Sequence, residues 1–153
     1  MTSDAKTWEP DAIARVQALL DRSAETATPV VGRVFARPDW RLSASEFLEM
    51  WSGQRWCTVA SVGQQAQPHL ALVHADFQSD GRLTMRMFTG SAREADILAN
   101  PRVALAKNLE GAAATVYGRA RVVSGTAATR HDAETVEVEV DVTRIYAMRP
   151  RRE

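Results

Sequence analysis

Residues 82–105 read RLTMRMFTGSAREADILANPRVAL, and this stretch indicates how the chain folds. Its first seven residues alternate between apolar side chains and mostly polar ones, which is typical of a strand with one buried face. Ser91 and Glu94 then have the spacing of a capping box, so a helix begins here, and Asn100-Pro101 ends it. The strand pattern resumes after the proline. A single short helix therefore interrupts a series of strands.

Strand patterns occupy most of the chain from residue 56 onward. They are rich in β-branched and aromatic residues and are separated by turn residues such as Asp80-Gly81. The six segments are WCTVASV (56–62), HLALVHADF (69–77), RLTMRMF (82–88), VALAKNL (103–109), ATVYGRARVV (114–123) and TVEVEVDVTRIYAM (135–148). Closure removes the unpaired edges of so many short strands, so the pattern predicts a closed or partly closed antiparallel barrel of six strands.

The last two strands carry complementary charges. In the final strand four valines are expected to point inward, and Glu137, Glu139 and Asp141 to point outward. The outward row of the preceding strand includes Arg119 and Arg121. Opposite charges directly across an antiparallel pair contribute roughly 0.2–1 kcal/mol each, so these two strands are predicted to be neighbours.

The N-terminal part of the chain has a helical pattern. The spacing of apolar residues predicts a helix over 10–22, and the prolines and glycine of 23–41 indicate a connecting segment. A second helix is predicted from Ser43, which has capping-box spacing to Glu46. In the helix between the third and fourth strands, Ile97 and Leu98 are expected to supply the buried side. We divide this single globular unit into an N-terminal helix with its connecting segment, 1–42, and a barrel domain, 43–153.

The overall composition excludes several classes of function. Nineteen basic residues balance nineteen acidic ones, so nothing favours nonspecific binding to nucleic acid or to an anionic membrane. No apolar run approaches the roughly 18 residues of a membrane span, and the N-terminus does not read as a secretory signal. Cys57 is the only cysteine, which excludes an intrachain disulfide. A cytoplasmic location is the simplest expectation.

The junction between the third strand and the helix is the best candidate for chemistry. Thr89, Ser91 and Arg93 lie within five residues of one another. A helix N-terminus attracts anions, the two hydroxyls can donate, and a guanidinium can hold phosphate oxygens bidentately. Alternatively, Ser91 only caps its helix and Arg93 is a solvated side chain. Three more arginines can enlarge the positive field: Arg82, Arg86 and Arg102.

The ordered segments resemble the pyridoxamine 5′-phosphate oxidase-like family of FMN-binding split barrels. The similarity covers about residues 51–149. It is carried by WCTVASVG, QPHLALVHADF, DGRLTMRMFTGSAREADILANPRVAL, VYGRARVV and VEVDVTRIYAM. The resemblance implies a mainly β (α+β) fold, namely a six-stranded antiparallel split β-barrel with a short helix between strands 3 and 4 and N-terminal helices. It also implies that 43–153 is a flavin-binding domain.

The resemblance further assigns cofactor-binding positions. It implies phosphate contacts from Thr89, Ser91 and Arg93, and an aromatic or apolar neighbour of the cofactor at Phe88. The second strand would run beside the isoalloxazine ring, often through backbone atoms, at Ala71, Leu72, Val73 and His74.

This chain departs from the true oxidases at several places. Ala71 stands where they carry Arg, and Ala113 falls near an expected Gln. The C-terminal region with their substrate-binding residues is expected to be missing, so pyridoxal phosphate synthesis is not predicted. His69 and His74 are expected on opposite faces of one strand, which argues against a shared metal.

The family resemblance and the residues together predict an FMN-binding oxidoreductase, a homodimer with the cofactor at the subunit interface and an unknown small-molecule substrate. No catalytic side chain is assigned, because the cofactor would carry the chemistry. One alternative is a reductase that uses the deazaflavin coenzyme F-420. Others are a non-catalytic protein that binds or stores flavin or haem, and a barrel that has lost its cofactor.

Overall fold

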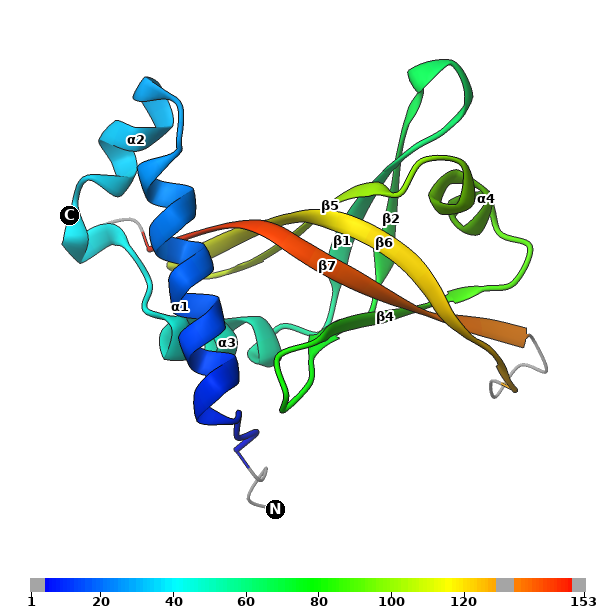
Figure 1. Ribbon diagram of the computed structural model, residues 1–153, viewed down its shortest axis with the longest axis horizontal. Coiled ribbons are helices and arrows are strands. Elements are labelled where there is room, and N and C mark those ends of the chain that lie inside the picture. The colour runs from blue at the N-terminus through cyan, green and yellow to red at the C-terminus, as the bar shows by residue number, and fades with distance from the viewer. Residues whose placement is uncertain (1–4, 129–133, 150–153) are drawn as a thin grey trace.

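The computed structural model describes residues 5–128 and 134–149. The helices are α1 (Pro10–Glu25), α2 (Pro29–Phe35), α3 (Ala44–Gly53) and α4 (Ala92–Ala99), with 3-10 turns η1 (Pro38–Trp40) and η2 (Gln64–Ala66). The strands are β1 (Cys57–Val62), β2 (Pro68–Val73), β3 (Ala75–Phe77), β4 (Leu83–Phe88), β5 (Arg102–Leu109), β6 (Ala112–Ala128) and β7 (Glu134–Met148). Figure 1 shows α1 and α3 at one end of the strands and α4 at the other.

The strands form one antiparallel sheet in the order β2-β1-β5-β6-β7-β4-β3. The predicted split-barrel class is confirmed, but the count of six strands is wrong, because the described chain has seven. The second predicted strand divides at His74 into β2, which pairs with β1, and β3, which pairs with β4. A continuous apolar run gives the same sequence pattern for one straight strand as for two strands joined by a bend. The bend carries one segment from one edge of the sheet to the other.

The predicted pairing of the last two strands is confirmed. Arg121 lies directly opposite Glu139, and Arg121 Nη2 stands 3.0 Å from Glu139 Oε1. The hairpin turn at Asp80-Gly81 is also present, with Gly81 at a φ of 86° that favours glycine. The alternation of β4 and β7 therefore gives the faces that the sequence predicts.

The N-terminal segment contains more helix than expected. The predicted first helix is present as α1 and continues to Glu25, while the segment read as a connection contains α2 and η1. α1 packs against β7, where the Ser23 hydroxyl accepts a hydrogen bond from the Ile145 amide at 3.0 Å. The apolar side of α1 joins the barrel core, since Val16 and Leu20 are buried in the same cluster as the strands.

The two other predicted helices begin where the capping residues place them. Ser43 and Glu46 form the full capping box of α3. At α4, Ser91 Oγ accepts from the Glu94 amide, whereas the Glu94 carboxylate accepts from Gly90, one residue before the cap. The expectation for Leu98 is wrong: its side chain is 70% exposed, and on this side of α4 the buried residue beside Ile97 is Asp96.

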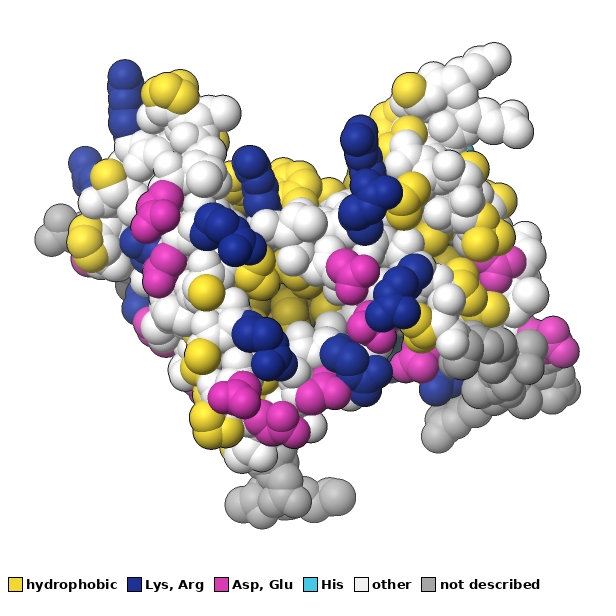
Figure 2. All heavy atoms as spheres, in the orientation of Figure 1, with side chains coloured by type: hydrophobic (Ala, Val, Ile, Leu, Met, Phe, Trp, Pro, Cys, Tyr) yellow, Lys and Arg dark blue, Asp and Glu magenta, His cyan; other side chains and the backbone are white. Residues whose placement is uncertain are grey.

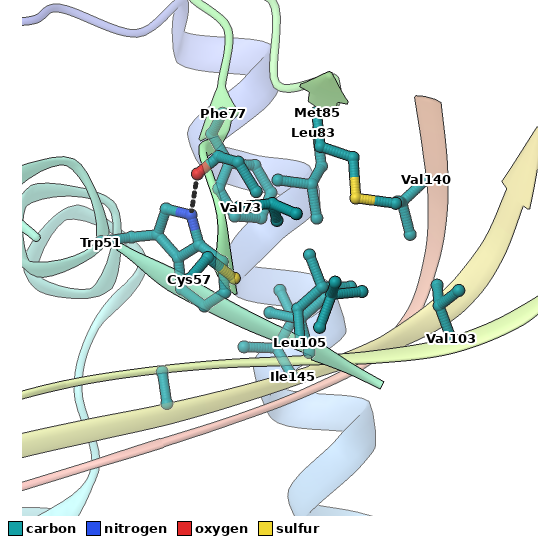
Figure 3. Packing of buried hydrophobic residues seen from close by; sticks show 14 of the residues in the cluster. Trp51, Cys57, Val73, Phe77, Leu83, Met85, Val103, Leu105, Val140 and Ile145 are labelled. Carbon is teal, nitrogen blue, oxygen red and sulfur yellow. Dashed lines mark hydrogen bonds between the residues drawn. The ribbon is translucent and has the colours of Figure 1, made fainter. Parts of the chain in front are cut away.

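Figure 3 shows the core, in which Trp51 of α3 lies among side chains from several strands. Its ring is buried and its Nε1 donates to the Ala75 carbonyl at 2.9 Å. Beneath it, Lys107 of β5 points into the barrel, with a fully buried side chain. Lys107 Nζ donates to the carbonyls of Trp51 at 2.9 Å and Gln54 at 2.7 Å. Because these carbonyls end α3, the ammonium caps that helix inside the core, and burial lowers the pKa of Lys107.

Replacing this ammonium tests how much the cap contributes to stability. Lys107→Met should lower the free energy of unfolding by about 2–4 kcal/mol, because two carbonyls lose a charged donor. Urea unfolding at pH 7 measures the change. Lys6→Met, at the only other lysine and on the surface, is the matched control and should change stability by less than about 0.5 kcal/mol. A Lys107→Met protein as stable as the parent would contradict the capping role.

Candidate functional site

The junction from β4 to α4 holds the three residues that the sequence singles out. Thr89 is exposed, and its amide donates to the Glu134 carbonyl at 2.9 Å, which ties the junction to β7. Gly90 has a φ of 77°, a left-handed conformation that turns the chain into the helix. The Ser91 hydroxyl accepts from Glu94 at 3.3 Å, so it serves as a helix cap here. An oxygen that accepts one hydrogen bond can still donate its own proton.

Arg93 has a buried side-chain atom, Nε, that makes no hydrogen bond within the part of the chain that the structure describes. The charge of Arg93 also acts on the Asp96 carboxyl and lowers the pKa of that group. The amides of Ala92 and Arg93 begin the helix and have no acceptor four residues back. A buried guanidinium nitrogen beside free helix amides favours an anionic ligand with oxygens. The corner therefore fits a phosphate, although the Glu94 carboxylate already accepts from one amide there.

The second candidate segment, Ala71–His74, follows the outer edge of the sheet. Leu72 is 64% exposed, whereas Val73 is buried and Ala71 packs against the core. His74 is exposed and stands edge-on to Trp56, with ring centroids 4.6 Å apart. β2 pairs with β1 alone, so half of its backbone N–H and C=O groups point away from the sheet. Leu72 and His74 can therefore contact a ligand through their side chains, whereas Ala71 and Val73 can do so only through their backbone.

Phe88 ends β4 on the outer face, and its ring is 48% exposed. It directly precedes Thr89 and so adds an apolar surface beside the polar junction. A planar ring can pack against such an exposed aromatic side chain.

A hydrogen-bonded cluster joins α4 to β1 and β2. Asp96 of α4 is buried, and its Oδ2 accepts from the Ser61 hydroxyl at 2.8 Å and lies 2.7 Å from His69 Nδ1. Ser61 and His69 face each other across β1 and β2. The hydrogen bond from His69 lowers the pKa of the Asp96 carboxyl, although burial acts in the opposite direction. Asp96, Ser61 and His69, which we call the latch, hold α4 against the edge strand.

The latch borders a cavity of about 590 Å³ between α4 and the hairpin that joins β1 to β2. Gly63 begins this hairpin, and a Cβ there would lie 2.5 Å from His69 Cε1. Gln65 and Ala66 both have left-handed backbone conformations, at φ of 56° and 57°. Such conformations cost non-glycine residues about 1 kcal/mol or more, so the surrounding structure must enforce the turn.

Two of the three arginines expected to enlarge the positive field at the junction, Arg82 and Arg102, lie elsewhere. Arg82 pairs with Asp80 at 2.7 Å and with Glu139 at 3.6 Å, near the hairpin between β3 and β4. Arg102 lies on the outer face of β5 and lines a different cavity. Arg86 is exposed on β4, directly opposite Glu137 of β7. Arg93 lies in the first turn of α4 and so belongs to the junction itself.

Other reactive groups do not form a site in the described residues. Burial raises the pKa of the Cys57 thiol to about 11, so it stays protonated at neutral pH. Within residues 5–128 and 134–149 no three His, Cys, Asp or Glu side chains are placed to hold a metal. His131 lies outside the described residues. None of the described helices is long and apolar enough to cross a membrane.

Comparison with known proteins gives the same fold. The family model described as pyridoxamine 5′-phosphate oxidase matches residues 43–149, which is more than half of the chain. The chain belongs to the pyridoxamine 5′-phosphate oxidase family. No curated protein matches it. Membership confirms the predicted split barrel but says nothing of the substrate.

Several solved structures share the family fold. A conserved hypothetical protein of Mycobacterium tuberculosis, Rv2991, is 17% identical with a TM-score of 0.65, covering 76% of this chain and 94% of its own. A protein of Mesorhizobium loti described as FAD-binding is 17% identical with a TM-score of 0.55, covering 72% and 96%. A protein described as an F-420 reductase is 17% identical with a TM-score of 0.50, covering 60% and 88%.

The latch of this family member is not among the residues that the sequence predicts. Its signal was present, because pairing β1 with β2 across their hairpin places Ser61 opposite His69. Asp96, next to Ile97, is a charged residue on the apolar side of a short helix, and such a residue normally has a buried partner. His69 and Asp96 are 27 positions apart, so no local pattern indicates that they pair.

Asp96→Asn tests the latch. The variant should lose about 2 kcal/mol of unfolding free energy at pH 7, because two hydrogen bonds to a charged oxygen weaken. The folded-state pKa of Asp96 is lowered below its unfolded value of about 3.9, so its stabilisation is present above about pH 4 and is lost as the pH falls further. The difference in unfolding free energy between the variant and the parent should therefore become smaller at acidic pH.

Urea unfolding from pH 7 down to pH 3 measures this dependence. Asp21→Asn is the matched control, since Asp21 makes an exposed ion pair with Arg41 and should contribute less than about 1 kcal/mol. An Asp96→Asn deficit that stays constant over the whole pH range would contradict the ionised latch.

Proposed function

We propose that this chain binds FMN between two copies of itself and acts as an oxidoreductase on a small molecule. The observation that carries the proposal is the buried Arg93 Nε, which has no hydrogen-bond partner among the described residues and lies at the start of α4. The phosphate of FMN would supply the missing acceptor. The shared fold with a protein described as FAD-binding supports a flavin over an unrelated phosphate ester.

The residues would divide the work between the two ends of the cofactor. Arg93, with the hydroxyls of Thr89 and Ser91, would hold the phosphate. The outward backbone groups of β2 and the side chains of Leu72 and Phe88 would orient the ring and exclude water from one side. When bound, FMN supplies electron or hydride transfer, so the chain needs no acid or base of its own.

Homodimerisation is part of the proposal, and the outer face of β2, β1 and β5 supports it. Strand register aligns Leu72, Thr58 and Ala106 in one row on this face, and Leu70, Ala60 and Ala104 in the next. All six side chains are uncharged, and Leu70 is 73% exposed. Small residues between exposed leucines form a flat apolar surface that a second copy can cover by two-fold symmetry. The partner would then provide the second wall that a flavin ring needs.

Coenzyme F-420 is the second candidate cofactor. A fold shared with a protein described as an F-420 reductase supports it, and its phosphate would meet the same arginine. The dispersal of Arg82 and Arg102 away from the junction removes the extended basic groove that its acidic tail would favour. This observation favours FMN.

Arg93→Gln tests the phosphate contact. We expect the parent to bind FMN more tightly than riboflavin, which lacks the phosphate, because a charged hydrogen bond contributes about 1.5–3 kcal/mol. The variant should bind FMN at least about tenfold more weakly than the parent does, and its affinity for riboflavin should be unchanged. Titration followed by flavin fluorescence measures all four affinities, and a parallel titration with F-420 ranks the two cofactors.

The control variant is Arg22→Gln, at an exposed arginine in the last turn of α1. It should bind FMN like the parent. Equal affinity of the parent for FMN and riboflavin would defeat the phosphate assignment. If the chain binds FMN but neither NADH nor NADPH reduces it and no substrate is turned over, the protein is an FMN carrier and not an enzyme.

Leu72→Glu tests the dimer face. The variant should elute as a monomer while the parent elutes as a dimer, because a dimer would bury two carboxylates without partners. Size-exclusion chromatography with light scattering measures the mass. Leu98→Glu, at an equally exposed leucine on α4, is the control and should remain dimeric. A parent that is monomeric at every concentration would overturn the interface, whatever its flavin affinity.

A further inference from the structure

A separate cleft of about 530 Å³ lies between α2 and the outer face of β5, β6 and β7. Figure 2 shows basic side chains gathered around a hollow between the N-terminal helices and the α4 end of the barrel, with hydrophobic side chains at its floor. The lining side chains that bear on the argument are Arg102, Arg119, Arg144, Tyr117, Tyr146 and Thr143. None of these residues belongs to the junction that holds Arg93.

The arginines of this cleft are brought together without acidic partners. Arg102 lies directly opposite Arg119 across β5 and β6, an arrangement of like charges that destabilises a sheet. Arg119 also lies opposite Asp141, but the ion pair that Asp141 makes is with Arg121, at 3.6 Å. Among the described residues no carboxylate lies within 4 Å of the guanidinium of Arg102, Arg119 or Arg144. An anion in the cleft would relieve this repulsion.

A bulge in β7 directs further groups into the cleft. The register shifts between Tyr117 and Gly118, which leaves Thr143 without a partner across the strands. The Thr143 hydroxyl donates to the Tyr117 carbonyl at 3.1 Å, and Arg144 comes to lie opposite Tyr117. Bulges of this kind re-aim side chains next to binding sites.

The cleft also has an aromatic wall. Tyr117 and Tyr146 stand nearly perpendicular, with ring centroids 6.2 Å apart, and Arg144 Nη1 donates to the Tyr146 hydroxyl at 3.2 Å. Tyr117 is 42% exposed, so part of its ring is accessible to a ligand. Exposed aromatic rings favour a planar ligand, while guanidinium groups favour phosphate or carboxylate oxygens.

We propose that this cleft binds a small planar aromatic anion, whose phosphate or carboxylate is held by Arg102, Arg119 and Arg144 and whose ring packs on Tyr117. The site is distinct from the α4 junction and does not rest on the proposed function. Its volume falls within the range of small-molecule sites, about 300–1,000 Å³.

Phenyl phosphate is the probe, because it carries one ring and one phosphate. To remove binding at the α4 junction, the titration is done on full-length Arg93→Gln as well as on the parent. Calorimetry should give one phenyl phosphate site per chain in Arg93→Gln. Affinity should fall roughly tenfold in the Arg93→Gln/Arg119→Gln double variant, because a charge-assisted hydrogen bond is lost. Tyr117→Ala should lower the affinity for phenyl phosphate and leave the affinity for inorganic phosphate unchanged.

The control substitution, again Arg22→Gln, lies outside the cleft and should leave the affinity unchanged. Arg102→Gln should not lower the melting temperature of the unliganded protein, because it removes a like-charge pair. Equal affinity for inorganic phosphate and phenyl phosphate would overturn the aromatic part of the assignment. The site itself would be overturned if Arg93→Gln bound no phenyl phosphate at millimolar concentration. It would also be overturned if adding Arg119→Gln left the affinity for phenyl phosphate unchanged.

Discussion

The fold depends on one constraint, which is that a single segment, 68–77, forms both outer strands of the sheet. The backbone bends at His74. As a result, β2 pairs with the free side of β1, and β3 pairs with the free side of β4. In the described sheet β2 and β3 remain the edges, so the outward backbone groups of β2 stay unpaired. Away from this bend β2 and β4 separate, and α4 lies at that end of the barrel, opposite α1 and α3 (Figure 1). The latch between Asp96 and His69 acts at this opening, because it fixes the helix to the edge strand.

Local rules predicted most of the fold. Alternation along β4 and β7 gave the inward and outward faces, and the capping residues Ser43 and Ser91 gave the starts of two helices. The bend at His74 was not predicted, because a run of apolar residues carries no mark of where a strand changes partners. Leu98 was misplaced for a related reason. In a helix of eight residues one apolar stripe has two plausible rotations, and the tertiary partner of Asp96 decides between them.

The candidate site was predictable only where its residues are close in sequence. Thr89, Ser91 and Arg93 share one junction, so a five-residue window contains them. The lack of a partner for Arg93 Nε is a tertiary property, and so is the meeting of Ser61 with Asp96 over 35 positions of sequence. Lys107 shows the same limit, since nothing in VALAKNL indicates that its lysine points inward to cap a helix more than fifty residues earlier.

Net charge is a poor guide to anion binding in this chain, because charges that cancel overall are not evenly distributed. Where β7 meets β6 and β4, acidic side chains neutralise arginines, with Glu139 contacting both Arg82 and Arg121. The balance of nineteen against nineteen argues against long polyanions, which respond to the whole molecule. It does not argue against small anions, which respond to groups within about one Debye length, roughly 8–10 Å. At that scale the described surface has positive sites at Arg93 and in the cleft of Arg102, Arg119 and Arg144. A chain with no net charge can therefore hold a small phosphate ester at a local positive site without attracting nucleic acid or an anionic membrane.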